Sequence, residues 1–93
     1  MLTVIPFSDK EEAIRLANDT DYGLEAAVWS SNLAEAQAVA QKLRVGTVWI
    51  NTFDVSDITT PFGEFKLSGH SRDRSFHAIE NYSLLKTTWV KLY

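Results

Sequence analysis

Two helix-start signals with the same spacing constrain the fold of this chain more than any other feature of its sequence. Ser8 stands three residues before Glu11, and Asn32 stands three residues before Glu35. In such a capping box, the first side chain accepts a hydrogen bond from a backbone amide of the first turn, and the glutamate reaches back to the cap residue. Each pair therefore predicts the first turn of a helix.

Apolar side chains recur at helical spacing after both signals. The face after Asn32 is the clearer one, because its apolar residues fall at i, i+3, i+4 and i+7: Ala36, Val39, Ala40 and Leu43. Turn-forming residues at 18–23 end the first predicted helix. Gly46 follows the second helix as a C-cap glycine would.

Short apolar runs precede and follow these helices, and each predicts a strand. They are Leu2–Phe7, Leu24–Ser30 and Thr47–Ile50. Two strand-helix pairs followed by a third strand are typical of parallel α/β architecture, in which each helix crosses over the sheet. We therefore expect an α/β fold built from parallel strand-helix units.

Residues 51–71 show no periodicity, and a connection of this length inside a compact domain is usually functional. Its apolar residues favour a packed loop: Phe53, Ile58, Phe62, Phe65 and Leu67. Beyond it, Phe76, Ile79 and Tyr82 indicate a short helix. Leu84–Tyr93 then forms a strand-like tail with alternating lysines.

Composition excludes several classes of function. The 93 residues make one domain at most, and the net charge of -3, with acids and bases interleaved, leaves no basic stripe for nucleic acid. No apolar run spans a bilayer and no signal peptide is evident, so we expect a cytoplasmic chain. There is no cysteine, which excludes a thiolate nucleophile. His70 and His77 lack a zinc-like pattern, and we expect no metal site.

Three motifs in order resemble the aldehyde dehydrogenase superfamily. The first, Glu12–Leu24, is similar to EAIxxANxTxYGL, and Gly46–Asn51 and Pro61–Gly69 are similar to GTVWVN and PFGGYKxSG. Leu85–Thr87 also resembles the closing VKT of that family. The resemblance covers essentially the whole chain.

A finer resemblance lies at Gly69–Ala78. This stretch is similar to the GRDKSLHALE segment of enzymes that oxidise gamma-glutamyl-gamma-aminobutyraldehyde, and Leu85–Trp89 supports the same match. The resemblance implies an aminoaldehyde as the substrate of the parent enzyme.

The family fold implies two parts for this chain. Residues 1–82 match the C-terminal part of the catalytic domain, including a long active-site loop, and residues 83–93 match an oligomerisation strand. In the family a cysteine thiolate attacks the aldehyde, hydride passes to NAD or NADP, and a glutamate activates the hydrolytic water. The cysteine, that glutamate and the nucleotide-binding domain all lie outside the matched segment, so we expect no catalytic residue here and no tight cofactor binding by this chain alone.

The resemblance assigns site residues position by position. Asp54, Val55, Ser56 and Phe62 match the wall of the aldehyde tunnel, and Leu24 and Phe62 match positions at the nicotinamide end of the cofactor site. Sequence alone allows a plainer role for each: Phe62 as the core anchor of its loop and Leu24 as a core residue at a strand start. Asp54 and Asp57 either attract a cationic aminoaldehyde or form solvated turns.

Three departures separate this chain from the family pattern. Glu64 replaces the second glycine of PFGG, and Ser71 replaces another glycine further on. Leu84 stands where many relatives carry a glutamate that pairs with the arginine matching Arg72. We expect Arg72 to find another partner, either Asp73 or a residue of a neighbouring subunit.

Two functions remain open at this level. The chain is either a segment of an aldehyde dehydrogenase, inactive alone, or a shortened noncatalytic paralogue that acts as an oligomerisation module. In both cases we expect Leu85–Leu92 to pair with another copy or with full-length subunits, and the apolar surface around Trp49, Trp89 and Tyr93 to drive association.

Overall fold

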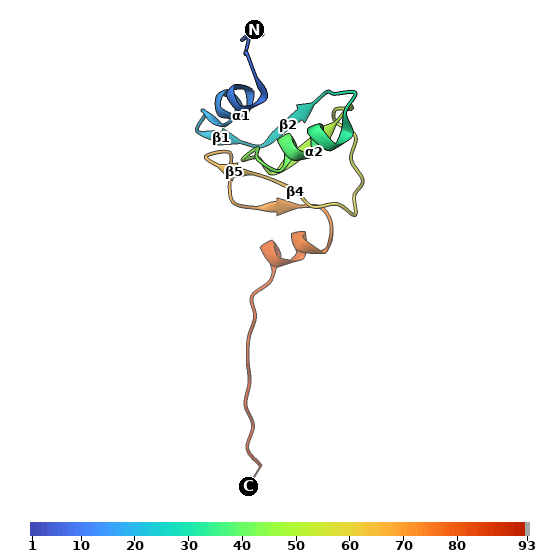
Figure 1. Cartoon of the computed structure of the whole chain (residues 1–93). Coiled ribbons are helices and arrows are strands. Elements are labelled where there is room, and N and C mark those ends of the chain that lie inside the picture. The colour runs from blue at the N-terminus through green and yellow to red at the C-terminus, as the bar shows by residue number, and fades with distance from the viewer. Residues whose placement is uncertain (93) are drawn as a thin grey trace.

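The computed structural model describes residues 1–92 as a small α/β body with a long C-terminal tail (Figure 1). The helices are α1 (Lys10–Asn18), α2 (Leu33–Ala40) and the 3-10 helix η1 (Phe76–Tyr82). The strands are β1 (Tyr22–Gly23), β2 (Glu25–Val28), β3 (Thr47–Ile50), β4 (Phe62–Gly63), β5 (Phe65–Lys66) and β6 (Arg72–Asp73). Within residues 1–92, no helix is long and apolar enough to cross a membrane.

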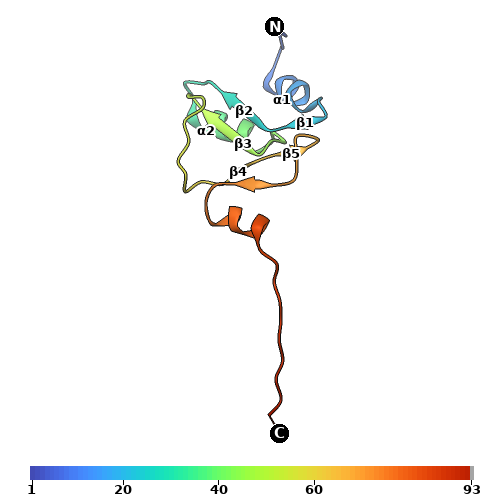
Figure 2. The same ribbon diagram turned by 180° about the vertical axis from the view of Figure 1, so that it is seen from behind.

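The centre of the body is one parallel strand-helix-strand unit. β2 pairs in parallel with β3 from Glu25 opposite Thr47 to Val28 opposite Ile50, and α2 is the crossover between them. Ala36 on α2 is fully buried and Trp49 on β3 is 7% exposed, so these two side chains form the core. Figure 2 shows α2 behind β2 and β3. The predicted parallel architecture is confirmed for this unit.

The two predicted helix starts differ in outcome. Asn32 caps α2, because its side chain accepts a hydrogen bond from the Glu35 amide at 3.2 Å. α1 begins one residue later than predicted: Asp9, not Ser8, is the cap, and Asp9 Oδ1 accepts from the Glu12 amide at 2.8 Å. The Glu12 carboxylate reaches back to the Ser8 amide at 2.8 Å.

Two local predictions are wrong. Leu2–Phe7 forms no strand, and all of its residues are exposed, because no strand of the described residues lies beside it. Gly46 is not a C-cap, because the cap of α2 is Gln41 in the right-handed helical conformation. Gly46 instead begins the parallel pairing, with its amide donating to the Gly23 carbonyl at 3.0 Å.

Residues 51–71 contain two short strands, which hold the chain in antiparallel pairs. β5 pairs with β1, with Gly23 opposite Phe65, and β4 pairs with β6, with Phe62 opposite Asp73. The predicted packing of this loop is wrong for four of its five apolar residues, because Phe53, Ile58, Phe65 and Leu67 are exposed, and Phe62 is half-buried. The predicted short helix after the loop is confirmed as η1.

The tail from Leu84 to Leu92 runs away from the body without regular secondary structure (Figure 1). Leu85 and Trp89 are almost completely exposed. Trp49, which we expected at the same apolar surface, is buried instead, because it packs into the body. Tyr93 lies outside the described residues. The pairing of this tail with another chain stays a prediction.

Candidate functional site

The loop that follows β3 carries three of the residues expected at the aldehyde tunnel, and Asn51 fixes its first turn. The Asn51 side chain brackets the backbone of Ser30: Oδ1 accepts from the Ser30 amide at 2.9 Å, and Nδ2 donates to the Ser30 carbonyl at 2.9 Å. Asn51 has a φ of 56°, a left-handed conformation that asparagine adopts more readily than most residues. The ends of β2 and β3 are thereby tied together.

Val55 is anchored through its backbone. The Trp49 indole Nε1 donates to the Val55 carbonyl at 2.7 Å, and the rings of Trp49 and Phe53 lie 5.1 Å apart. The Val55 side chain remains 67% exposed. Asp54 is exposed and has a φ of 56°, so it turns the chain immediately before Val55. The buried core of the body thus sets the position of this part of the loop.

Arg74 joins the other two expected wall residues. Its Nη1 donates to the Ser56 hydroxyl, and its guanidinium carbon lies 5.3 Å from the centre of the Phe62 ring. The register between β4 and β6 places Asp73 opposite Phe62, and Arg74 is the next residue. Arg74 was not identified from the sequence, because its role depends on a contact with a residue 18 positions away.

An open, mainly apolar cavity of about 470 Å³ lies between the loop and η1. Its lining residues are Ile58, Thr59, Arg74, Ser75, Phe76 and Ile79. The Ser75 amide donates to the Ile58 carbonyl at 2.9 Å, which fixes the loop against the start of η1. Apolar lining with a few placed polar groups is typical of small-molecule sites.

Asp57 is a turn former, as one of our two alternatives held. Its Oδ1 accepts hydrogen bonds from the Thr59 amide at 2.7 Å and from the Thr59 hydroxyl at 2.5 Å. The Thr59 hydroxyl, and next the Thr59 amide, hold the pKa of Asp57 below its ordinary value. Its carboxylate is therefore engaged within the loop.

Leu24 lies apart from this cluster. It links β1 and β2, is 36% exposed, and lines a separate cavity of about 230 Å³ with Ala17, Leu43 and Val45 among others. The backbones of Leu24 and Gly63 nevertheless converge at Gly46. The structure brings Ser56 and Phe62 to the same guanidinium, that of Arg74, whereas Leu24 lines a separate cavity.

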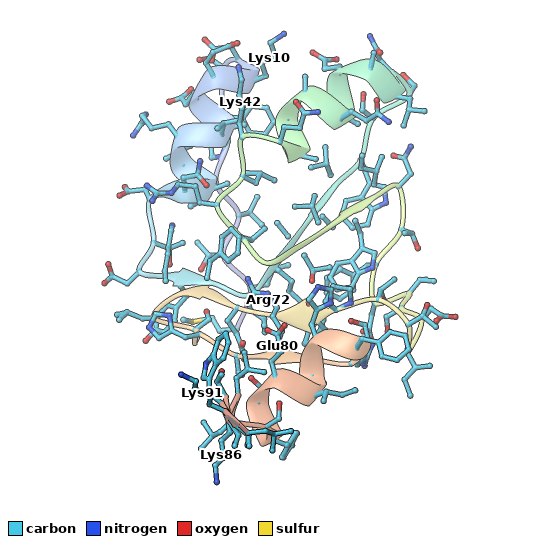
Figure 3. All side chains as sticks on the ribbon, turned by 90° about the horizontal axis from the view of Figure 1, so that it is seen from below. Lys10, Lys42, Arg72, Glu80, Lys86 and Lys91 are labelled. Atoms are coloured by element: carbon cyan, nitrogen blue, oxygen red, sulfur yellow. The ribbon has the colours of Figure 1, made fainter. Side chains whose placement is uncertain are left out.

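Glu64 and Ser71, the two residues that replace family glycines, are both hydrogen-bonded to Arg72 through their backbones. Arg72, labelled near the middle of Figure 3, donates from Nη1 to the carbonyls of Glu64 at 2.7 Å and Ser71 at 2.9 Å. Its guanidinium lies 5.3 Å from the centre of the Phe65 ring. Arg72 thus finds backbone partners rather than Asp73. Glu64 Oε2 is buried without a hydrogen-bond partner among residues 1–92.

The family of this chain follows from comparison with known proteins. The model of the aldehyde dehydrogenase family matches residues 1–88. The chain belongs to the aldehyde dehydrogenase family. The resemblance given by its motifs is therefore confirmed.

Relatives of this chain in the aldehyde dehydrogenase family are much longer. An Escherichia coli NADP/NAD-dependent aldehyde dehydrogenase, PuuC, is 45% identical over 99% of the chain, which spans 19% of that protein. The solved structure of the aldehyde dehydrogenase KauB from Pseudomonas aeruginosa is 58% identical, with a TM-score of 0.90 over 98% of this chain and 18% of its own. A gamma-glutamyl-gamma-aminobutyraldehyde dehydrogenase from Burkholderia cenocepacia is 53% identical, with a TM-score of 0.85 over 94% of this chain and 18% of its own.

The structural match supports the α/β class directly. The short strands and the crossover helix α2 are those of a fragment of the larger aldehyde dehydrogenase fold. The chain spans about one fifth of the length of the curated relatives that it matches.

Proposed function

We propose that this chain acts as the C-terminal segment of an NAD(P)-dependent aldehyde dehydrogenase, in which it supplies part of the aldehyde-tunnel wall and of the subunit interface. Residues 1–82 are assigned to the catalytic domain and residues 83–93 to the oligomerisation strand. The cluster of Ser56, Phe62 and Arg74 carries the proposal, because two residues of the loop meet the residue that follows β6 beside an open apolar cavity.

The wall residues orient the aldehyde and exclude water. The Phe62 ring supplies apolar bulk, and Ser56 and the exposed side chains of Asp54 and Val55 line the loop beside it. A fixed wall favours catalysis because it holds the aldehyde carbon in one geometry for nucleophilic attack. The nucleophile comes from outside these residues, since the chain contains no cysteine.

Leu24 and Phe62 are the residues proposed to contact the nicotinamide end of the cofactor. Both are apolar, which suits contact with the face of a nicotinamide ring, and the carbonyl oxygens of Leu24 and of Gly63, the residue after Phe62, both lie near Gly46. NAD or NADP, when bound, accepts hydride from the substrate. A P. syringae indole-3-acetaldehyde dehydrogenase that is 56% identical has been solved with NAD+, which supports a cofactor of this class.

We assign an aminoaldehyde as the substrate class of the complete enzyme. The similarity of residues 69–78 to the gamma-glutamyl-gamma-aminobutyraldehyde enzymes supports it, and so does the Burkholderia structure of that name. Of the two aspartates, the exposed Asp54 is the one proposed to attract a cationic group, because the carboxylate of Asp57 is held by Thr59.

The tail supports the interface role. Leu84, Leu85, Trp89, Val90 and Leu92 are each at least 75% exposed, and this stretch has no strand partner within residues 1–92. An extended segment with exposed apolar side chains and free backbone groups gains hydrogen bonds and buried area when it joins the sheet of another subunit. Lys86 and Lys91, labelled in Figure 3, lie on the same tail and oppose unrestricted aggregation.

Sedimentation measures the oligomeric state and so tests whether the tail forms a subunit interface. At tens of micromolar the full chain is expected to be a dimer or larger, and a form ending at Tyr82 is expected to lose this association. A well-folded monomer of the full chain would contradict the interface role.

An activity assay of the chain alone tests the catalytic side of the proposal. We expect no aldehyde-dependent formation of NADH above the blank, since the nucleophile is absent. Turnover that persists after removal of contaminating enzyme would overturn the assignment of the chain as an incomplete part.

A second function, that of a noncatalytic oligomerisation module, is favoured by Glu64. Among residues 1–92 its Oε2 is buried without a hydrogen-bond partner at a position where the family pattern has a glycine, and such an unsatisfied oxygen costs stability. Cosedimentation with a full-length aldehyde dehydrogenase, without any change in the activity of that enzyme, would support this alternative.

A further inference from the structure

We propose that Arg74 is a positioning residue of the aldehyde-tunnel wall: its guanidinium holds the Ser56 hydroxyl beside the face of Phe62 and thereby fixes the loop between β3 and β4. This inference rests on the proposed function for the role of the wall. The contacts themselves are independent of it.

The register of the β4–β6 pair places Arg74 beside the Phe62 ring. Asp73 lies opposite Phe62 in the ladder, so the residue that follows leaves the strand beside the Phe62 ring. Arg74 and Ser75 have φ values of 61° and 52°, both in the left-handed region, which turns the backbone sharply into η1. Non-glycine residues with this conformation are uncommon and persist only where surrounding contacts hold them.

Three contacts hold Arg74 and Ser75 in this conformation. The Arg74 guanidinium donates to Ser56 while its carbon lies 5.3 Å from the centre of the Phe62 ring. The Ser75 amide, one residue on, donates to the Ile58 carbonyl at 2.9 Å. The planar guanidinium suits this arrangement, because it can stack on a ring and donate in its own plane at the same time.

Two hydrogen bonds hold the loop at the neighbouring residues Val55 and Ser56. The Val55 carbonyl, which belongs to the peptide unit between Val55 and Ser56, accepts from the buried Trp49 indole at 2.7 Å. The Ser56 side chain on the far side of that unit accepts from Arg74. Trp49 ties the loop to the core, and Arg74 ties it to Phe62 and η1. Removal of the Arg74 side chain therefore leaves this part of the loop with one of its two supports, the hydrogen bond from Trp49.

We call the contacts of Arg74 with Ser56 and Phe62 the clamp. Exchange of the Trp49 indole hydrogen reports on the clamp, because this N–H bonds to the loop next to Ser56. The other two tryptophans, Trp29 and Trp89, are 65% and 92% exposed, whereas Trp49 is 7% exposed. Hydrogen exchange of the Trp49 indole and of the Ser75 amide, followed by NMR on the full chain, measures how often the loop opens.

Four variants separate the clamp from general destabilisation. Arg74→Leu removes the charge and the donors, and Ser56→Ala removes only the hydroxyl acceptor. Arg74→Lys keeps a cation for the ring and a donor for the hydroxyl. Arg15→Leu makes the same change at an arginine on α1 whose ion pair with Glu12, at 3.7 Å, is on the surface.

Arg74→Leu is expected to speed exchange at Trp49 and Ser75 by about tenfold, as loss of one charge-assisted hydrogen bond and one cation–π contact implies. Ser56→Ala should produce a smaller increase at the same sites, and Arg74→Lys should restore most of the protection. Arg15→Leu should leave both rates unchanged. Because the experiment needs neither aldehyde nor cofactor, its failure is distinct from failure of the proposed function.

Wild-type exchange rates in Arg74→Leu would overturn the proposal, and so would an equal increase in Arg15→Leu. If Arg74→Leu unfolds the whole chain, Ser56→Ala decides: faster exchange at Trp49 with an unchanged thermal midpoint supports the clamp, and unchanged exchange overturns it.

Discussion

Gly46 lies directly against the backbone of Gly63. A Cβ on Gly46 would stand 1.7 Å from the Gly63 carbonyl oxygen and 3.3 Å from the Leu24 carbonyl oxygen. The starts of β2 and β3 and the strand β4 therefore meet at a point that has no room for a side chain. This close approach connects the parallel pair to the strand that carries Phe62.

Gly46→Ala is expected to destabilise the chain by about 3 kcal/mol, because the backbone of Gly63 must move to accept even a methyl group. Urea unfolding followed by tryptophan fluorescence measures the change. Ser31→Ala, an exposed substitution of similar size, serves as the control and should have little effect. A midpoint for Gly46→Ala equal to that of the control would show that the contact is not tight.

Asn51 should contribute stability in two separable ways. Asn51→Gly keeps the left-handed conformation but loses both side-chain hydrogen bonds to Ser30, for an expected loss of about 1 to 2 kcal/mol. Asn51→Ala should lose about 1 kcal/mol more, since alanine is strained at positive φ. Denaturant unfolding of the two variants measures both terms. Equal stability of the two would argue against strain at this position.

The N-terminus of α1 should depend on pH through Glu12. Hydrogen bonds from the Ser8 amide and then the Ser8 hydroxyl lower the pKa of Glu12 below its ordinary value of 4.5. A lowered folded-state pKa means that the carboxylate stabilises the helix start above pH 4.5, and that this stabilisation is lost as the pH falls through the lowered value. Amide exchange of residues 10–13 between pH 6 and 3 should show the loss in the wild type and not in Glu12→Gln. Glu11→Gln is the control, and identical pH profiles for all three proteins would contradict the cap.

The parallel unit was predictable because its signals are local. Asn32 and Glu35 lie within one turn, and the apolar face of α2 and the β-branched run of β3 need no information about distant residues. The start of α1 shifted by one residue because Ser8 and Asp9 are both cap residues and only the folded backbone selects between them. Leu2–Phe7 has the composition of a strand, but a strand also requires a neighbour, and composition does not supply one.

The candidate site was predictable only in part. Ser56 and Phe62 were identified through the resemblance to relatives, whereas no periodicity marks them. Arg74 was missed because its contacts follow from the register of β4 on β6 and from its positive φ, which are properties of the fold. Glu64 was recognised as a departure from the family, but the burial of its Oε2 without a partner among residues 1–92 is visible only in three dimensions.

Whether Phe62 lines the aldehyde path is tested most directly in a chimeric enzyme. This chain would replace the matching segment of the Escherichia coli dehydrogenase, to which it is 45% identical, and the aldehyde dependence of NAD+ reduction would be measured with and without Phe62→Ala. The chimera should be active, and Phe62→Ala should lower kcat/KM for the aldehyde by about 10- to 100-fold. Wild-type kinetics together with a lowered thermal midpoint would contradict the wall assignment and make Phe62 a core anchor of its loop.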